Sequence, residues 1–105
     1  MGYEVLRTEA FEDDYDHAVQ YLIFKQGSLE AARQLADEID EAREVLKANP
    51  FVRAISTKEY FQNRPYREYP LSHYLIVYVV EEEAVIWLRF FHQRQSPARQ
   101  VIDWR

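Results

Sequence analysis

Residues 73–94 have the sequence HYLIVYVVEEEAVIWLRFFHQR, and this stretch decides the fold. Its two apolar parts, Tyr74–Val80 and Ala84–Phe91, consist almost wholly of β-branched and aromatic residues, which favour packed strands. Glu81–Glu83 lie between them, and three adjacent carboxylates would repel one another in a buried strand. The stretch therefore predicts an antiparallel hairpin with a short acidic turn.

The two faces of this hairpin differ in polarity if Val80 pairs with Ala84. One face is then wholly apolar and needs a cover, and it carries Tyr74, Ile76, Tyr78, Ile86, Leu88 and Phe90. The other face is mixed, and it carries His73, Leu75, Val77, Val79, Val85, Trp87, Arg89 and Phe91. A sheet that is covered on one side and partly open on the other would show this pattern. A slip of one residue in the register would exchange the faces.

Two helices are predicted before the hairpin, after a first strand at Tyr3–Arg7. Thr8 is a suitable N-cap for the first helix, and Gly27 is a suitable end for it. Ser28 caps the second helix, which ends before Pro50. The apolar positions with helical spacing are Phe11, Tyr15, Ala18 and Leu22, then Ala32, Leu35, Ala36, Ile39, Ala42 and Leu46. These two stripes are the natural cover for the continuous apolar face of the sheet.

The remaining segments have weaker signals. A short strand or packed loop is expected around Phe51–Ile55, and Tyr66–Tyr69 is predicted to be a strand that Pro70 ends. The tail Gln93–Arg105 is expected to form a last strand or a short docked helix. The 105 residues are thus expected to form one α+β domain. In it, an N-terminal strand and a helical hairpin accompany a mostly antiparallel β-sheet, with the hairpin packed on one face.

The composition restricts the kind of protein. The chain has no cysteine, which excludes disulfides and thiolate metal sites, and it has no apolar run long enough to span a membrane. The three histidines are scattered along the sequence and predict no metal site. The acidic N-terminus has no apolar signal-peptide region, so a soluble cytoplasmic protein without a cofactor is expected.

The net charge of −5 is unevenly distributed along the chain. Residues 1–48 hold 12 acidic and 5 basic side chains, whereas residues 49–105 hold 6 acidic and 8 basic ones. All of these later basic residues except Lys58 are arginines, which suit bidentate contacts with phosphates and carboxylates better than lysine does. The asymmetry indicates either a site for an anionic partner or ordinary surface arginines, and composition alone favours the second interpretation.

The segment from Tyr66 to Arg94 resembles the RelE/ParE superfamily of toxins from toxin–antitoxin systems. The resemblance rests on Arg67 and Tyr69, the apolar strand YLIVY, the acidic turn, a second apolar strand, and His92 with Arg94. In element order the similarity covers nearly the whole chain. It implies a growth-inhibiting toxin that a cognate antitoxin holds silent. The RelE branch cleaves messenger RNA at the ribosome, and the ParE branch, often labelled plasmid stabilisation proteins, poisons DNA gyrase.

RNA cleavage by a metal-independent endoribonuclease needs an acid or base and a cation for the crowded phosphate. His92 is the candidate acid or base, because imidazole titrates near neutral pH. The candidate catalytic cations are Arg67 and Arg89, and the candidate substrate-binding residues are Lys58, Arg64 and Arg94. The resemblance to the RNase branch matches Arg67 to the strand arginine and places His92 near the usual catalytic position.

Two departures weigh slightly against the enzyme and leave both targets open. The chain is acidic, whereas ribosome binding favours a basic protein, and Gln93 rather than a tyrosine follows His92. The residues also have plainer interpretations. Arg89 would stack on an aromatic ring or pair with an acidic side chain, and His92 would be structural. The alternative function is a non-toxic protein-binding module that keeps the fold without the activity.

Overall fold

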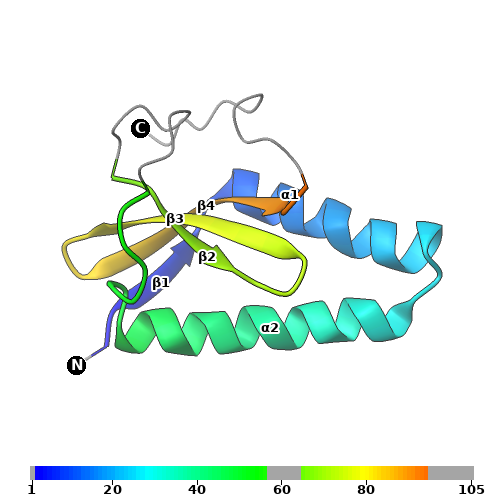
Figure 1. The fold of residues 1–105 in the computed structure, drawn as a ribbon, viewed down its shortest axis with the longest axis horizontal. Helices are drawn as coiled ribbons and strands as arrows, with labels where there is room; N and C mark the ends of the chain where they lie inside the picture. Colours follow the sequence, from blue (N-terminus) through cyan, green and yellow to red (C-terminus); the bar gives the residue numbers. More distant parts are fainter. Residues whose placement is uncertain (1, 57–64, 95–105) are drawn as a thin grey trace.

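The computed structural model describes residues 2–56 and 65–94. Their elements are β1 (Glu4–Arg7), α1 (Glu9–Gln20), η1 (Tyr21–Lys25), α2 (Leu29–Ala48), β2 (Arg67–Pro70), β3 (Tyr74–Glu81) and β4 (Ala84–His92). Figure 1 shows α1 and α2 joined at one end, with α2 running beneath the sheet. The predicted α+β architecture, with a helical hairpin on one face of the sheet, is confirmed.

The four strands form one sheet in the order β1-β4-β3-β2. The two pairs made by β3 are antiparallel, whereas β1 lies parallel to β4. Because β1 is short, it pairs only with the first part of β4, from Ala84 to Trp87. Beyond Trp87, β4 therefore has no strand neighbour on that side among the described residues, and this open stretch is where the candidate site lies.

Thr8 connects β1 to α1 and fixes where α1 starts. Its N–H donates to the carbonyl oxygen of Trp87 at 3.0 Å, so it still belongs to the sheet. Its hydroxyl accepts from the N–H of Phe11 at 3.1 Å and donates to the carbonyl of Leu88 at 2.8 Å. Thr8 is therefore the predicted N-cap, and it also holds the first turn of α1 against β4.

The turn between the helices follows its sequence signals. η1 is a short π-helix that continues α1 to Lys25, and the backbone of Gly27 has a φ of 62°, in the left-handed region. Ser28 caps α2 by accepting from the N–H of Ala31 at 3.0 Å. Both predicted roles, the stop at Gly27 and the cap at Ser28, are confirmed.

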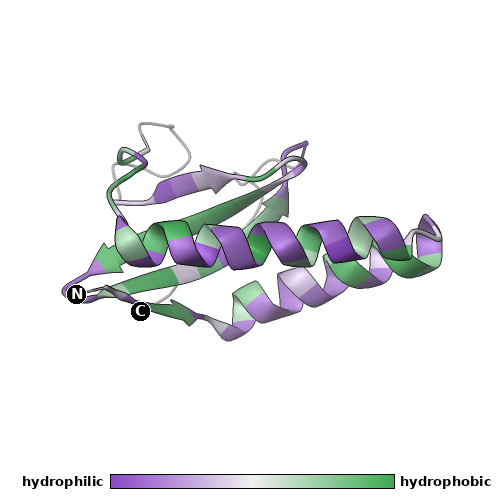
Figure 2. Ribbon diagram, turned by 90° about the horizontal axis from the view of Figure 1, so that it is seen from below, coloured by the Kyte–Doolittle hydropathy of each residue, from purple (hydrophilic) through white to green (hydrophobic). Residues whose placement is uncertain are grey.

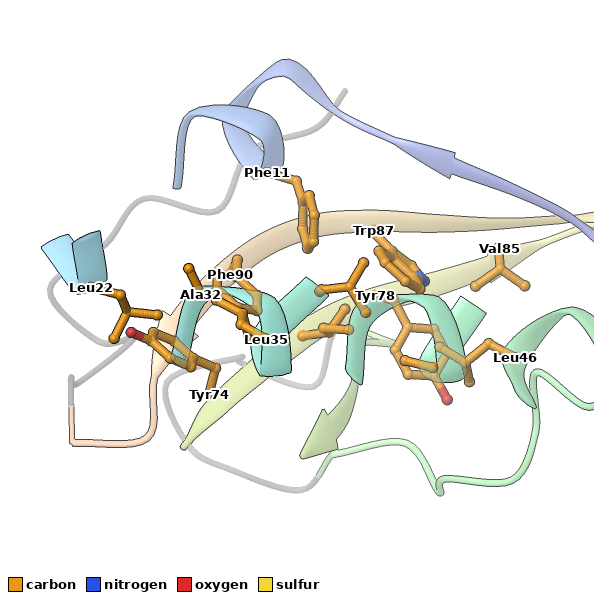
Figure 3. Close-up of a cluster of buried hydrophobic side chains, with 13 residues drawn as sticks. Phe11, Leu22, Ala32, Leu35, Leu46, Tyr74, Tyr78, Val85, Trp87 and Phe90 are labelled. Carbon is orange, nitrogen blue, oxygen red and sulfur yellow. The ribbon is translucent and has the colours of Figure 1, made fainter. Parts of the chain in front are cut away.

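The core lies between the helices and one face of the sheet. Polar and apolar bands alternate along both helices, and the apolar bands supply the predicted stripes (Figure 2). In Figure 3, side chains from α1, α2, β3 and β4 meet in this space. The buried members are Phe11, Leu22, Ala32, Leu35, Ile39, Ala42, Leu46, Tyr74, Ile76, Tyr78, Val85, Trp87 and Phe90.

The predicted face of β4 is wrong in its first half. Val85 and Trp87 point to the helices, whereas Ile86 and Leu88 belong to the opposite cluster. The cause is the length of the turn: Glu81 pairs with Ala84, so β4 is shifted by one residue from the predicted pairing of Val80 with Ala84. Only Glu82 and Glu83 are left to form the turn, and Glu82 adopts a left-handed backbone conformation with a φ of 50°.

A β-bulge in β4 then reverses the alternation. Tyr78 pairs with Trp87 and Val77 pairs with Arg89, so Leu88 is the extra residue between them. The bulge returns Phe90 to the helix side, where it was predicted to lie. It also sits at the point where β1 ends, and it turns the last residues of β4 toward α1.

The face of the sheet away from the helices was predicted to be partly open, and that prediction is wrong. Ile86 on this face is partly buried, and five other side chains there are almost fully buried, at 2% exposure or less: Tyr66, Val77, Val79, Leu88 and Phe91. The cationic and imidazole side chains therefore cannot be presented from a bare face of the sheet. They lie at its end instead.

Three further expectations concern the ends of the sheet. The segment around Phe51–Ile55 is not packed, since Phe51 and Val52 are about half exposed, but Ile55 forms an isolated bridge with Arg67. The predicted strand before Pro70 is confirmed as β2. The expected strand or helix in the tail falls on residues 95–105, outside the described residues. Among residues 2–56 and 65–94, no helix has both the length and the apolar character needed to cross a membrane.

Candidate functional site

A cleft of about 920 Å³ lies where the second half of α1 and η1 face the start of β3 and the end of β4. We call it the histidine cleft, because all three histidines of the chain line it. Its polar lining consists of Asp14, His17, Gln26, His73, Arg89, His92 and Arg94. Its apolar lining includes Tyr21, Tyr74 and Phe90. The volume lies within the range of about 300–1,000 Å³ that small-ligand pockets have.

Arg89 and Asp14 both line this cleft, and they form an ion pair with each other. The Nε and Nη2 atoms of Arg89 donate to Oδ2 and Oδ1 of Asp14 at 2.6 and 3.0 Å, and both side chains are less than one-fifth exposed. Oδ2 also accepts from the N–H of Phe90 at 3.0 Å. The guanidinium carbon lies 5.2 Å from the ring centroid of Phe91. Both plainer interpretations of Arg89, an acidic partner and an aromatic neighbour, are thus confirmed.

His92 is the imidazole at the end of β4. Its Nδ1 accepts from the N–H of Arg94 at 3.1 Å, and its ring meets the ring of Tyr74 edge-on at 5.2 Å between centroids. Burial lowers the pKa of His92, and the nearby charges of Arg94 and His73 lower it further. Both effects favour the neutral imidazole, and the acceptor role of Nδ1 assigns its proton to Nε2.

Arg67 lies apart from the histidine cleft. It belongs to β2, the strand at the other edge of the sheet, and it pairs with Tyr78. Its Nη1 donates to the carbonyl oxygen of Arg53 at 2.5 Å, and its guanidinium carbon lies 5.1 Å from the ring centroid of Phe51. Of the four described site candidates, the structure gathers Arg89, His92 and Arg94 in one cleft and places Arg67 elsewhere.

The other two candidates, Lys58 and Arg64, lie outside the described residues. His17 and His73 were not among the candidate site residues from the sequence, yet both line the cleft. One signal for His17 exists: it follows Asp14 by three residues, which places both on one face of α1. His73 carries no comparable local signal. Within residues 2–56 and 65–94, no group of three or more histidines and carboxylates is arranged to hold a metal ion.

Chemically, the cleft suits binding better than proton transfer. Arg94 supplies a cation, three imidazoles supply hydrogen-bonding groups, and aromatic rings supply an apolar wall. Asp14 cancels the charge of Arg89. The arrangement can therefore receive an anionic group together with an apolar side chain.

Comparison with known proteins gives a consistent picture. The model of the family described as the ParE toxin of the type II toxin–antitoxin system parDE matches residues 5–97. A chain of the toxin–antitoxin complex RelBE2 from Mycobacterium tuberculosis has a TM-score of 0.63 and 19% identity, over 90% of this chain and 95% of that chain. The conserved hypothetical protein HP0894 from Helicobacter pylori has a TM-score of 0.59 and 20% identity, over 89% and 97%. At these identities the two structures show a shared fold. No curated protein matches the sequence.

Proposed function

The chain belongs to the family of ParE toxins of type II toxin–antitoxin systems, and on that premise we propose that it arrests growth by binding DNA gyrase. We further propose that a cognate antitoxin neutralises it. The neighbour from Mycobacterium tuberculosis is itself named as part of a toxin–antitoxin complex, which supports a partner of this kind. The proposal places the chain in the cytoplasm, where gyrase and translating ribosomes are found.

The ion pair between Asp14 and Arg89 is the observation that favours gyrase binding over RNA cleavage. A nuclease of this kind needs its arginines aimed at the phosphate, but both contacting nitrogens of Arg89 already face a carboxylate. A phosphate near Arg89 would also approach Asp14. Two like charges 4 Å apart repel by about 4 kcal/mol at a dielectric constant of about 20. The second predicted catalytic cation, Arg67, is on another strand.

The state of His92 supports the same conclusion. A general base needs an open lone pair within hydrogen-bond reach of the proton that it takes. The lone pair of the neutral ring is on Nδ1, which already accepts from the backbone N–H of Arg94. The lowered pKa also disfavours the imidazolium form of His92, which is the form that would act as an acid. His92 is thus better suited to donate a hydrogen bond from Nε2 than to move a proton.

The charge of the chain is a further support. Binding to the ribosome or to naked RNA gains most of its affinity from cations that displace counterions. This chain has a net charge of −5. A protein target such as gyrase makes no comparable demand on the net charge of its partner.

The test is expression from a tightly regulated promoter, alone and together with the adjacent gene that encodes the antitoxin. We expect growth to stop in the first case and to recover in the second, with no new 5′ ends on abundant messages by primer extension. Harmless expression at high protein levels would contradict growth arrest and would favour a non-toxic binding module. New message ends that are absent with the His92→Gln variant would contradict gyrase as the target and would identify ribosome-bound mRNA instead.

A further inference from the structure

We propose that two copies of this chain associate through a face formed by one side of α2, the segment 50–56 and β2. We call it the α2–β2 face, and its contacting side chains are Asp37, Glu41, Phe51, Val52, Arg53, Ile55 and Arg67. The dimer goes beyond the proposed function, because neither gyrase nor an antitoxin takes part in it. None of these residues lines the histidine cleft, so such a dimer carries two copies of the cleft.

Exposed apolar side chains form the centre of the α2–β2 face. The side chains of Phe51, Val52 and Ile55 are 54%, 48% and 48% exposed, and they lie within five residues of one another. The guanidinium carbon of Arg67 lies 5.1 Å from the ring centroid of Phe51, and the ring of Tyr3 meets the Phe51 ring edge-on. Aromatic rings and arginines are enriched in the centres of protein interfaces. The composition of the patch is therefore that of a contact surface.

The backbone that carries this patch is fixed at its start. Segment 50–56 leaves the end of α2 and rises toward the start of β2 (Figure 1). The N–H of Phe51 donates to Oδ1 of Asn49 at 3.1 Å, and the buried hydroxyl of Tyr78 donates to the carbonyl oxygen of Pro50 at 2.9 Å. A surface that is already ordered loses less conformational entropy when a partner binds, and this favours association.

The outer edge of β2 is occupied, so a partner meets side chains there rather than an open strand. The carbonyl oxygen of Tyr66 accepts from the N–H of Ser56 at 2.7 Å, and that of Glu68 accepts from Nε of Arg53 at 3.2 Å. An added strand would need these two acceptors. Contact through the apolar patch and the charges around it is therefore favoured over extension of the sheet.

Opposite charges lie side by side on this face. Asp37 and Glu41 are exposed and lie one turn apart on α2. Burial raises the pKa of Tyr69, the charge of Glu41 raises it further, and the charge of Arg53 lowers it, so both charged groups lie near this tyrosine. Among residues 2–56 and 65–94, no ion pair engages Asp37, Glu41 or Arg53. Both signs are thus available to a partner.

This arrangement is self-complementary. A two-fold axis that passes between Glu41 and Arg53 places the cation of each copy against the carboxylate of the other. Because both copies use the same face, the contact closes at two chains. A partner of one sign, such as a nucleic acid, would instead be repelled by the carboxylates of α2. The net charge of −5 opposes association mainly at long range, where salt screens charges beyond about 8 Å at physiological ionic strength.

The test is sedimentation equilibrium of the full chain over a concentration series from about 1 μM to about 1 mM, the range in which weak interfaces dissociate. We expect the average mass to rise from that of one chain to that of two and to stop there. The mass of a single chain at every concentration would overturn the proposal. Continued growth to larger assemblies would overturn the two-fold arrangement.

Matched aromatic variants locate the interface. Phe51→Ser should weaken the dimer at least tenfold. Phe24→Ser removes a ring that is 79% exposed on η1, outside the α2–β2 face, and should leave the dimer unchanged. Circular dichroism checks that both variants fold. Equal losses in the two variants would mean non-specific attraction between apolar surfaces and would overturn the assignment.

Charge reversal gives a second test that does not depend on Phe51. Arg53→Glu and Glu41→Arg should each weaken the dimer at least tenfold when the variant is alone, because like charges then meet. An equal mixture of the two variants should form a heterodimer, since opposite charges meet again at both contacts. A mixture that stays monomeric at concentrations where the parent chain is dimeric would refute the pairing. Both tests are read without gyrase, so their failure leaves the proposed function standing, and its failure leaves the dimer standing.

Discussion

The carboxylate of Asp14 takes the place of a strand partner for Arg89 and its neighbour at the end of β4. It receives the guanidinium through contacts of 2.6 and 3.0 Å and the N–H of Phe90 at 3.0 Å. Since β1 ends at Arg7, this part of β4 has no described strand beside it, and α1 lies there instead. The carboxylate of Asp14 thus accepts a hydrogen bond from a backbone N–H at the open edge of β4, and it also neutralises the guanidinium of Arg89.

Replacing Asp14→Asn should lower the free energy of unfolding by about 2–3 kcal/mol. The amide keeps the shape of the carboxylate but removes the negative charge that Asp14 places against Arg89, and breaking a largely buried pair is costly. Urea unfolding measures the change. The neighbouring variant Asp13→Asn, on an exposed position of the same helix, should stay within about 0.5 kcal/mol of the parent chain. Equal losses in the two variants would show that the ion pair has no special weight.

Replacing Thr8→Ala should cost about 1–2 kcal/mol of stability. The change removes the N-cap of α1 and leaves the carbonyl of Leu88 without the hydroxyl that donates to it. Thr8→Ser keeps both hydrogen bonds and should retain most of the stability. Thermal unfolding of the two variants side by side checks this. A loss in Thr8→Ser as large as in Thr8→Ala would point to the methyl group rather than to the hydroxyl.

Replacing Gly27→Ala should cost about 1 kcal/mol through the backbone alone. Gly27 has a φ of 62°, a left-handed conformation in which an ordinary side chain is strained. A Cβ atom at this position would meet no atom within 4 Å, so no clash contributes. Gly27→Asn should cost less, because asparagine tolerates this conformation. Chemical denaturation that ranked asparagine below alanine would contradict the backbone explanation.

Alkaline pH should destabilise the fold through Tyr78. Burial raises the pKa of Tyr78 to about 12, and its hydroxyl donates to the carbonyl oxygen of Pro50 at 2.9 Å. Because the folded state holds this proton more tightly than the unfolded state does, stability is full below about pH 10 and falls as the pH rises through 12. Burial also raises the pKa values of Tyr15, Tyr69 and Tyr74 in the same direction.

The matched variant for this effect is Tyr78→Phe. It should be less stable than the parent chain by about 1 kcal/mol at neutral pH, since the carbonyl of Pro50 loses its donor. Its stability should also decline less steeply between pH 10 and 12. Free energies of unfolding from urea titrations across that range provide the comparison. Parallel declines in the two proteins would assign the alkaline effect to the other tyrosines.

The helices could be predicted because their signals are local. As N-caps, Thr8 and Ser28 bind backbone N–H groups three residues further along the chain, and the apolar stripe of α2 is set by helix geometry. The faces of β4 could not be predicted in the same way. They depend on a left-handed residue at Glu82, which glycine or asparagine would have signalled, and on a bulge at Leu88 that no residue type announces.

The candidate site could be predicted only in part. Arg89, His92 and Arg94 lie close together in the sequence, but the predicted register placed His92 on the face opposite Arg89, and the structure brings all three to one cleft. The partner of Arg89 was not visible, because Asp14 is 75 residues away and reaches it only through the packing of α1 against an open edge. His17 and His73 come from two further segments, and only the assembled fold brings them to His92.

The most direct test of the account is the supercoiling of relaxed plasmid by purified gyrase in the presence of the purified chain. The account predicts that supercoiling is lost at stoichiometric protein and that it returns when the antitoxin is added. A reaction with translating ribosomes and the same protein should leave the message intact. Full supercoiling at a large excess of the chain, together with a message that is cut by the chain but not by its His92→Gln variant, would contradict it.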